Sequence, residues 1–104
     1  MERIAFKMKL YPGQENEYRK RHDELWPELS ALLKNIGISD YSIFFDEETH
    51  TLFGVFKVND RGLLEQLPKE PVMQKWWAYM SDIMETNRDN SPVSKVLKEV
   101  FYLV

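Results

Sequence analysis

Two kinds of hydrophobic spacing follow one another along this chain, and their order constrains its fold more than any other feature. Over residues 3–10 every second side chain is apolar (Ile4, Phe6, Met8 and Leu10), which is the pattern of a strand with one buried face. Later stretches have either this period or the period of an amphipathic helix. The spacing predicts strands over residues 3–10, 41–45, 51–58 and 96–104, and helices over residues 14–35, 60–67 and 71–84.

The order strand, helix, strand, strand, helix, strand predicts an α+β fold of the ferredoxin-like βαββαβ type, with an antiparallel sheet and helices on one face. The 104 residues fit one such domain, over residues 1–104. The residues on both faces of the strands are apolar, so the face of the sheet that carries no helices must also be shielded from water. We therefore expect a homodimer in which two sheets form a dimeric α/β barrel. The residues that indicate it are Phe44, Phe45, Phe53, Val55 and Phe101.

Proline and glycine mark where the elements break. Pro27 stands inside the long helical stretch, where a proline either kinks a helix or occupies the first turn of a new one. We therefore expect two helices that meet near Trp26 and Pro27, or one kinked helix. Gly37 follows the stretch and predicts its end, because glycine commonly follows the last helical residue.

Composition argues against several classes of protein. The net charge is −3, without the basic surface of a nucleic-acid-binding protein, and we expect Arg19, Lys20 and Arg21 to form the solvated side of a helix. No apolar run approaches the roughly 18 residues that a membrane span needs. The alternating N-terminus does not resemble a signal peptide. The chain has no cysteine, which fits a reducing compartment, and we expect a cytoplasmic protein.

Aromatic and titratable residues provide candidate site residues. Tyr18 and His22 stand four residues apart in a helical stretch, so their side chains can converge. Trp76 and Trp77 point about 100° apart on a helix, so one can pack in the core while the other faces a cavity. Tyr41 begins a strand, and its phenol could enter a pocket or cap the sheet edge. An imidazole that moves protons near neutral pH, together with indole faces, suits a neutral sugar.

Each of these features also has a purely structural interpretation. Tyr18 could be a partly buried tyrosine beside a surface histidine, and both tryptophans could simply pack. The two histidines, His22 and His50, are far apart in the sequence and do not have a metal-binding spacing, so we expect no metal site. The sequence contains no nucleophile motif of the GxSxG type and no glycine-rich phosphate loop.

Four blocks of sequence, spread in order over essentially the whole chain, carry a resemblance to a known family. They are Tyr18-Arg19-Lys20-Arg21-His22 with Trp26-Pro27-Glu28-Leu29, Tyr41-Ser42-Ile43, Trp76-Trp77-Ala78-Tyr79-Met80, and Asn90-Ser91-Pro92-Val93-Ser94 with Glu99-Val100-Phe101-Tyr102-Leu103. Together they resemble the L-rhamnose mutarotase family. The long blocks at Trp26 and Asn90 make a chance match a poor explanation.

The resemblance implies an isomerase that interconverts the α and β anomers of L-rhamnopyranose. It implies a dimeric ferredoxin-like fold, L-rhamnose as the small-molecule partner, and no metal or organic cofactor. The proton donor of the family matches His22. Its sugar-contacting residues match Tyr18, Tyr41, Trp76 and Trp77.

Anomerisation opens the sugar ring and closes it on the opposite face, which requires a base at the anomeric hydroxyl and an acid at the ring oxygen. An imidazole with an ordinary pKa near 6.5 can serve either step. We expect protonated His22 to act as the acid in ring opening, which predicts a rate that declines as pH rises. Tyr18 and Tyr41 would hold the sugar, and Trp76 or Trp77 would stack on it.

Two alternatives belong to other functional classes. Dimeric ferredoxin-like barrels also include small monooxygenases and haem-degrading enzymes, so the fold alone does not decide. His22 fits a haem ligand poorly because Arg19, Lys20 and Arg21 precede it. A non-catalytic sugar-binding module would bind rhamnose without changing the rate of anomer exchange.

Overall fold

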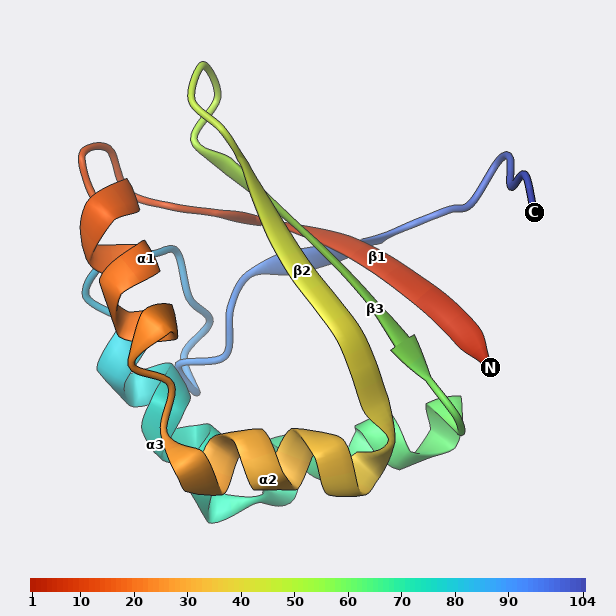
Figure 1. Cartoon of the computed structure of the whole chain (residues 1–104). Helices are drawn as coiled ribbons and strands as arrows, with labels where there is room; N and C mark the ends of the chain where they lie inside the picture. The colour runs from red at the N-terminus through yellow and green to blue at the C-terminus, as the bar shows by residue number, and fades with distance from the viewer.

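The computed structural model describes residues 1–104, which form a four-stranded antiparallel sheet with one layer of helices (Figure 1). Its strands lie in the order β2-β3-β1-β4, and each neighbouring pair is antiparallel. This is the ferredoxin-like arrangement that the order of the hydrophobic patterns predicts. Along the chain the elements are β1 (Glu2–Lys9), α1 (Glu15–Asp23), α2 (Pro27–Ile36), β2 (Ile38–Asp46), β3 (Thr51–Val58), the 3-10 helix η1 (Arg61–Lys69), α3 (Pro71–Met80) and β4 (Ser94–Leu97).

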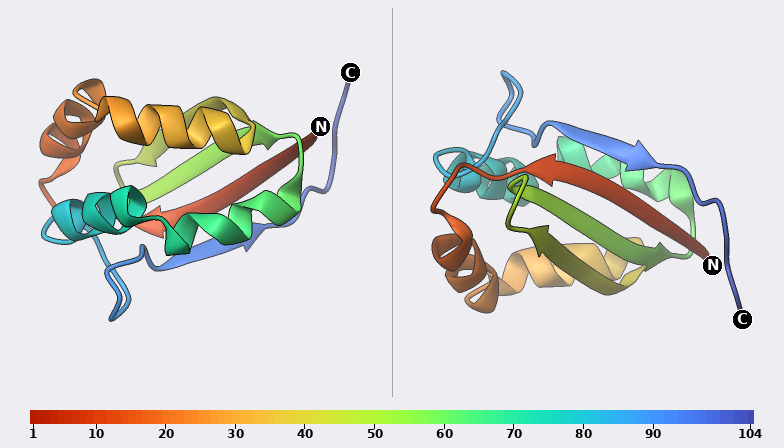
Figure 2. Two further views of the ribbon diagram at one scale, coloured as in Figure 1. Left: turned by 90° about the horizontal axis from the view of Figure 1, so that it is seen from below. Right: turned by 90° about the horizontal axis from the view of Figure 1, so that it is seen from above.

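The helices lie on one face of the sheet and leave the other face bare, as the two opposite views in Figure 2 show. Alternate residues of the strands point into the space between the sheet and the helices, where the buried side chains form two clusters. One cluster lies toward α1 and α3 and includes Met8, Leu29, Leu52, Trp76 and Met80. The other lies at the opposite end of the sheet and consists of Ile4, Ile36, Ile38, Phe56 and Val58.

The long helical stretch is two helices, as one of the two alternatives predicts. Pro27 occupies the first position of α2, where its missing N–H costs nothing, and Trp26 precedes it with extended backbone angles. Gly37 ends α2 with φ 96°, in the left-handed region that favours glycine. Figure 1 shows the sharp turn between α1 and α2, which sets the two helices along different edges of the molecule.

The second helical region differs in detail from the prediction. Residues 61–69 form a 3-10 helix that contains Pro68, and α3 ends at Met80 instead of continuing to residue 84. The Ser81 hydroxyl bonds the Ala78 carbonyl at 2.7 Å and competes with the next helical turn. Beyond it, Met84 forms an isolated β-bridge with Leu10, so the chain turns back towards the sheet.

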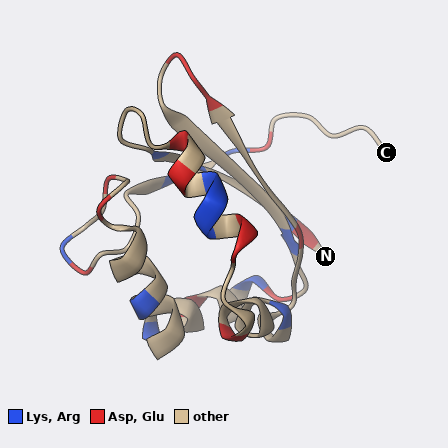
Figure 3. Ribbon diagram, turned by 60° about the vertical axis from the view of Figure 1, so that its left-hand side comes forward, with Lys and Arg blue, Asp and Glu red and all other residues tan.

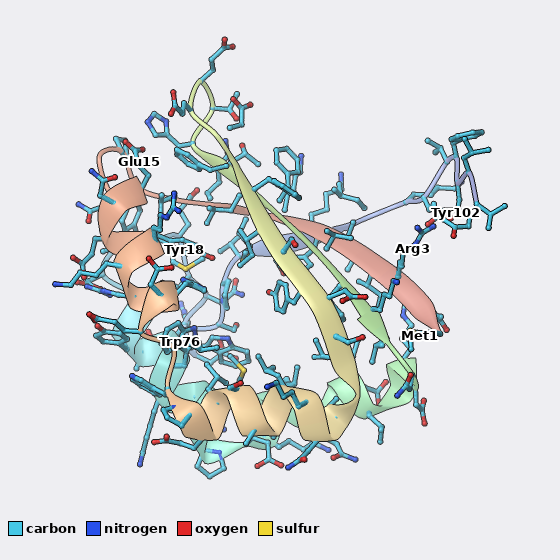
Figure 4. All side chains as sticks on the ribbon, in the orientation of Figure 1. Met1, Arg3, Glu15, Tyr18, Trp76 and Tyr102 are labelled. Carbon is cyan, nitrogen blue, oxygen red and sulfur yellow. The ribbon has the colours of Figure 1, made fainter.

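The prediction of a last strand over residues 96–104 is wrong in extent. β4 covers Ser94–Leu97 and pairs only with β1, and residues 98–104 leave the sheet (Figure 1). The segment rests on the side chain of Arg3, which pairs with Glu99 at 3.4 Å and lies 3.6 Å from the centre of the Tyr102 ring. Figure 4 shows Arg3 and Tyr102 together at that end of the sheet. The other side chains of the segment have no core to enter, and Val100 is 88% exposed.

Candidate active site

A large cavity of about 1070 Å³ lies between the sheet and the helices. A smaller cavity of about 80 Å³ adjoins it, and all its lining residues except Met80, Met84 and Asn90 also line the large one. All five candidate site residues (Tyr18, His22, Tyr41, Trp76 and Trp77) line both cavities. The structure therefore brings together residues that are up to 59 positions apart in the chain (18 to 77). In Figure 4 Tyr18 on α1 and Trp76 on α3 lie at the same end of the molecule.

His22 lies in the last turn of α1, with its imidazole fixed from three sides. Its Nδ1 lies 2.9 Å from the carbonyl oxygen of Tyr18, which can only accept a hydrogen bond, so Nδ1 carries the proton of the neutral ring. The Tyr18 ring stacks on the imidazole at 4.3 Å between centroids, and Trp76 meets it edge-on at 5.4 Å. The remaining nitrogen, Nε2, keeps its lone pair and has no partner in the protein.

Burial lowers the pKa of His22 below its ordinary value of 6.5. The hydrogen bond to the Tyr18 carbonyl and the charge of Asp23 act in the opposite direction but are smaller. Desolvation disfavours the charged ring, because an imidazolium loses more hydration energy than a neutral imidazole. At neutral pH His22 is therefore a neutral base with a free Nε2.

The two tyrosines provide hydroxyl groups that stay protonated. Tyr18 is 8% exposed, and burial raises its phenol pKa, with a smaller contribution from nearby Tyr41. Tyr41 leaves 40% of its surface accessible because it borders the open cavity. Surrounding protein nevertheless desolvates its hydroxyl and raises its pKa as well. Both phenols can donate hydrogen bonds to an oxygen of a ligand throughout the neutral range.

A β-bulge aims Tyr41 into the cavity. The register of β2 against β3 shifts between Ser39 and Ser42, where Asp40 adopts φ 49°. An extra residue changes which side chains face the helices, so Tyr41 follows Ile38 onto the inner face. Without the bulge, strict alternation from Ile38 would turn Tyr41 to the outer face.

Gly54 leaves room for the ring that supports Tyr41. Phe6 lies opposite Gly54 in the register of β1 and β3. A Cβ atom added at Gly54 would lie 2.7 Å from Cε1 and 2.9 Å from Cε2 of the Phe6 ring. That ring packs edge-on against Tyr41 at 6.2 Å between centroids. The glycine therefore allows Phe6 to fill the floor of the cavity beneath Tyr41.

The tryptophan pair divides as helix geometry predicts. Trp76 is 6% exposed and is surrounded by aromatic rings, with Trp26 edge-on at 5.1 Å, Tyr79 at 5.7 Å and His22 on a third side. Trp77 is half-buried and lines the cavity without an aromatic partner. Trp77 thus has the freer ring face, whereas Trp76 is held within the protein.

Arg21 does not form part of a solvated face, contrary to the prediction for the basic run on α1. Figure 3 shows the basic turn of α1 between two acidic turns. Within that charged helix, the Arg21 side chain is nevertheless only 10% exposed. The guanidinium bonds Asp82 with both Nη atoms, at 2.9 and 3.3 Å, and Nη1 also donates to the Tyr79 carbonyl at 2.6 Å. The pKa of Arg21 is raised, chiefly by the hydrogen bond to Asp82. Arg21 therefore ties the helix of His22 to the end of the helix of Trp76 and Trp77.

Two further structural facts concern metal binding and membrane insertion. No three His, Cys, Asp or Glu side chains lie in a group that could hold a metal ion. None of the helices is both long and apolar enough to cross a lipid bilayer.

The fold and the cavity place this chain among the α+β proteins with a ferredoxin-like sheet. A solved structure described as a dimeric ferredoxin-like protein from an uncultured marine organism matches it with a TM-score of 0.57 over 97% of this chain and 96% of the other. The two are 14% identical, so the likeness is one of fold alone.

Sequence comparison defines the family. The model of the L-rhamnose mutarotase family matches residues 3–103. A relative from Brucella anthropi named L-rhamnose mutarotase is 61% identical over 98% of this chain and 96% of its own length. The crystal structure of L-rhamnose mutarotase from Formosa agariphila covers both chains completely, with 55% identity and a TM-score of 0.93. The chain belongs to the L-rhamnose mutarotase family.

Proposed function

We propose that this protein is an L-rhamnose mutarotase, an isomerase that interconverts the α and β anomers of L-rhamnopyranose. The observation that carries the proposal is the neutral imidazole of His22, whose Nδ1 is occupied by the Tyr18 carbonyl and which lines a cavity together with two phenols and two indoles. Membership of the family supports the same activity. The monooxygenase and haem-degrading alternatives rest on the fold alone, and no feature of the cavity favours them.

Ring opening begins when His22 Nε2 takes the proton from the anomeric hydroxyl. The bond between the anomeric carbon and the ring oxygen breaks, a carbonyl forms, and the ring oxygen receives a proton. Both oxygens are bonded to the same carbon, so the imidazolium can return its proton to the ring oxygen without moving far. The open chain then rotates about the bond to the aldehyde carbon, and the same steps in reverse close the ring on its other face.

The other site residues hold the sugar for this transfer. The protonated phenols of Tyr18 and Tyr41 donate hydrogen bonds to its oxygens. Trp77 covers an apolar face of the ring, because indole surfaces suit the C–H face of a sugar. Trp76 contributes mainly by holding His22 and the wall of the cavity in place.

The contacts of His22 favour a pH dependence opposite to the one expected from the sequence. A general base must be neutral to act, and the pKa of His22 is lowered by burial. Activity should therefore be lost as pH falls through a midpoint below 6.5 and should level off above neutral pH. Saturation-transfer NMR of the anomeric protons, with and without the protein, tests the activity. A protein that binds L-rhamnose but leaves anomer exchange at its spontaneous rate would be a sugar-binding module instead.

A homodimer is the most economical way to cover the bare face of the sheet. Phe44 and Phe53 are partners in the register of β2 and β3, and Phe44 is 64% exposed. Two residues beyond Phe53, Val55 of β3 pairs with Ala5 of β1, and Ala5 pairs on its other side with Leu97 of β4. These residues continue the apolar strip across the sheet. The apolar segment of residues 100–104 adds a second uncovered surface. Monomeric proteins rarely expose apolar patches of this extent.

Sedimentation equilibrium at micromolar concentration tests the dimer, and a single species of 12.5 kDa would exclude it. The Phe44→Glu variant should weaken association, because it places a charge on the exposed apolar strip at its β2 end. A cytoplasmic location stays a prediction, which fractionation of the source cells would test.

A further inference from the structure

The loop of residues 87–92, between α3 and β4, holds its shape through its own hydrogen bonds. The Asn87 amide donates to Ser91 Oγ at 3.1 Å, and the Ser91 N–H donates to the Asp89 carboxylate at 3.0 Å. On the backbone, the Asn87 N–H donates to the Ser91 carbonyl at 2.7 Å, and the Asn90 N–H donates to the Asn87 carbonyl at 3.0 Å. These bonds fix the loop without using the side chain of Asn90.

Asn90 instead lies at the candidate site. The residue adopts φ 70°, a left-handed conformation that asparagine tolerates better than most residues. It is half-buried and lines the small cavity together with all five candidate site residues. It does not line the large cavity, and the same is true of Met80 and Met84. Asn90 therefore belongs to the side of the small cavity that faces away from the large one.

Polar chemistry is scarce on that side of the cavity. Met80 and Met84 donate no hydrogen bonds, so a sugar hydroxyl placed there would lose its hydration without compensation. The Asn90 amide both donates and accepts, which matches a hydroxyl or a neighbouring pair of hydroxyls on a sugar ring. We infer that the Asn90 side chain binds hydroxyl groups of the sugar ring and thereby selects which sugars the site accepts.

This inference rests on the proposed function and goes beyond it by assigning a specificity-determining residue. A sugar that lacks the matching hydroxyl would leave a half-buried amide unpaired. Sites that hydrogen-bond a substrate hydroxyl discriminate strongly against analogues without it, because the polar groups of the site are then left without partners. Asn90 acts on binding, and the proton transfer stays with His22.

The test compares the wild-type protein with Asn90→Gly, which removes the amide and retains the positive φ. The matched control is His50→Gly, which makes the same kind of change at φ 57° in the hairpin between β2 and β3 and outside both cavities. Affinities for L-rhamnose and for its singly deoxygenated analogues are measured from tryptophan fluorescence. Thermal unfolding shows whether each variant folds. Asn90→Asp, which keeps the size but loses the N–H donors, replaces the glycine variant if that variant is unfolded.

We expect Asn90→Gly to bind L-rhamnose about tenfold more weakly, which corresponds to ~1.4 kcal/mol, while exchange at saturating sugar changes little. In the wild type, one deoxy analogue should bind about tenfold more weakly than L-rhamnose. The variant should bind that analogue and L-rhamnose equally, and the His50→Gly control should behave like the wild type. If the variant discriminates among the analogues as the wild type does, the assignment of Asn90 is wrong although the proposed function stands. A wild-type protein that neither binds L-rhamnose nor accelerates anomer exchange overturns both.

Discussion

Replacing His22 with asparagine tests the proposed mechanism most directly. The asparagine amide can still donate to the Tyr18 carbonyl in place of Nδ1, which lies 2.9 Å from that oxygen in the wild type. No atom then remains at the position of Nε2, so the variant loses the proton-transferring group while keeping the local hydrogen bond. Positioned proton transfer contributes about 10²–10⁴-fold to rates. We therefore expect catalysed anomer exchange to fall at least about 100-fold, or ~2.7 kcal/mol in the activation barrier.

The same substitution should leave folding and binding largely intact. It removes ring contacts of the imidazole with Tyr18 and Trp76, and aromatic pairs contribute about 0.5–1.5 kcal/mol each. The proposed contacts of Trp77 and Tyr41 with the sugar do not involve His22. We expect a modest loss of stability and a change in affinity much smaller than the change in rate.

Saturation-transfer NMR provides the assay, with the spontaneous exchange rate subtracted at each pH from about 5 to 8. His50→Asn is the matched control, because it changes the only other histidine, which has φ 57° and lies in a turn where asparagine is well tolerated. The wild type and the control should lose activity as pH falls below 6.5, and His22→Asn should show no such titration. Exchange at the wild-type rate in His22→Asn would refute the mechanism. Wild-type activity that increases as pH falls would refute the role of the neutral ring as a base.

Four other substitutions test how the site is built. Gly54→Ala should lower the free energy of unfolding by about 1–3 kcal/mol, because the added methyl overlaps the Phe6 ring; an unchanged urea midpoint would show that the ring moves freely. Trp77→Phe should raise KM several-fold with kcat nearly unchanged, whereas Trp76→Phe should mainly lower stability, by about 1–3 kcal/mol. Equal kinetic effects of the two changes would contradict this division. Arg21→Lys should lower the free energy of unfolding, measured in urea, by about 1–2 kcal/mol, since lysine cannot replace the paired bonds of Arg21 to the exposed Asp82 carboxylate.

The sequence by itself determined the order of the elements and the identity of the candidate site residues. Hydrophobic period reports which face of a strand or helix is buried, and Pro27 and Gly37 act locally. A break or kink at Pro27, the end of the helical stretch at Gly37 and the strand hairpin could therefore be predicted without any tertiary information. The motifs around His22 and Trp76 gave the family resemblance, which the family comparison confirms. The sequence overestimated the last strand because alternation continues past Leu97, where the chain leaves its only strand partner.

Only the tertiary structure decided how these residues act together. The Tyr18 carbonyl fixes the tautomer of His22 and burial lowers the pKa of its ring, and neither can be read from an i, i+4 spacing. The pairing of Arg21 with Asp82 joins segments 61 residues apart, so the basic run looked like a solvated face. Likewise, Asn90 lines the small cavity through a loop geometry that turn-forming residues alone do not specify. Desolvation and long-range contacts depend on which segments meet in space, and that information is absent from local sequence patterns.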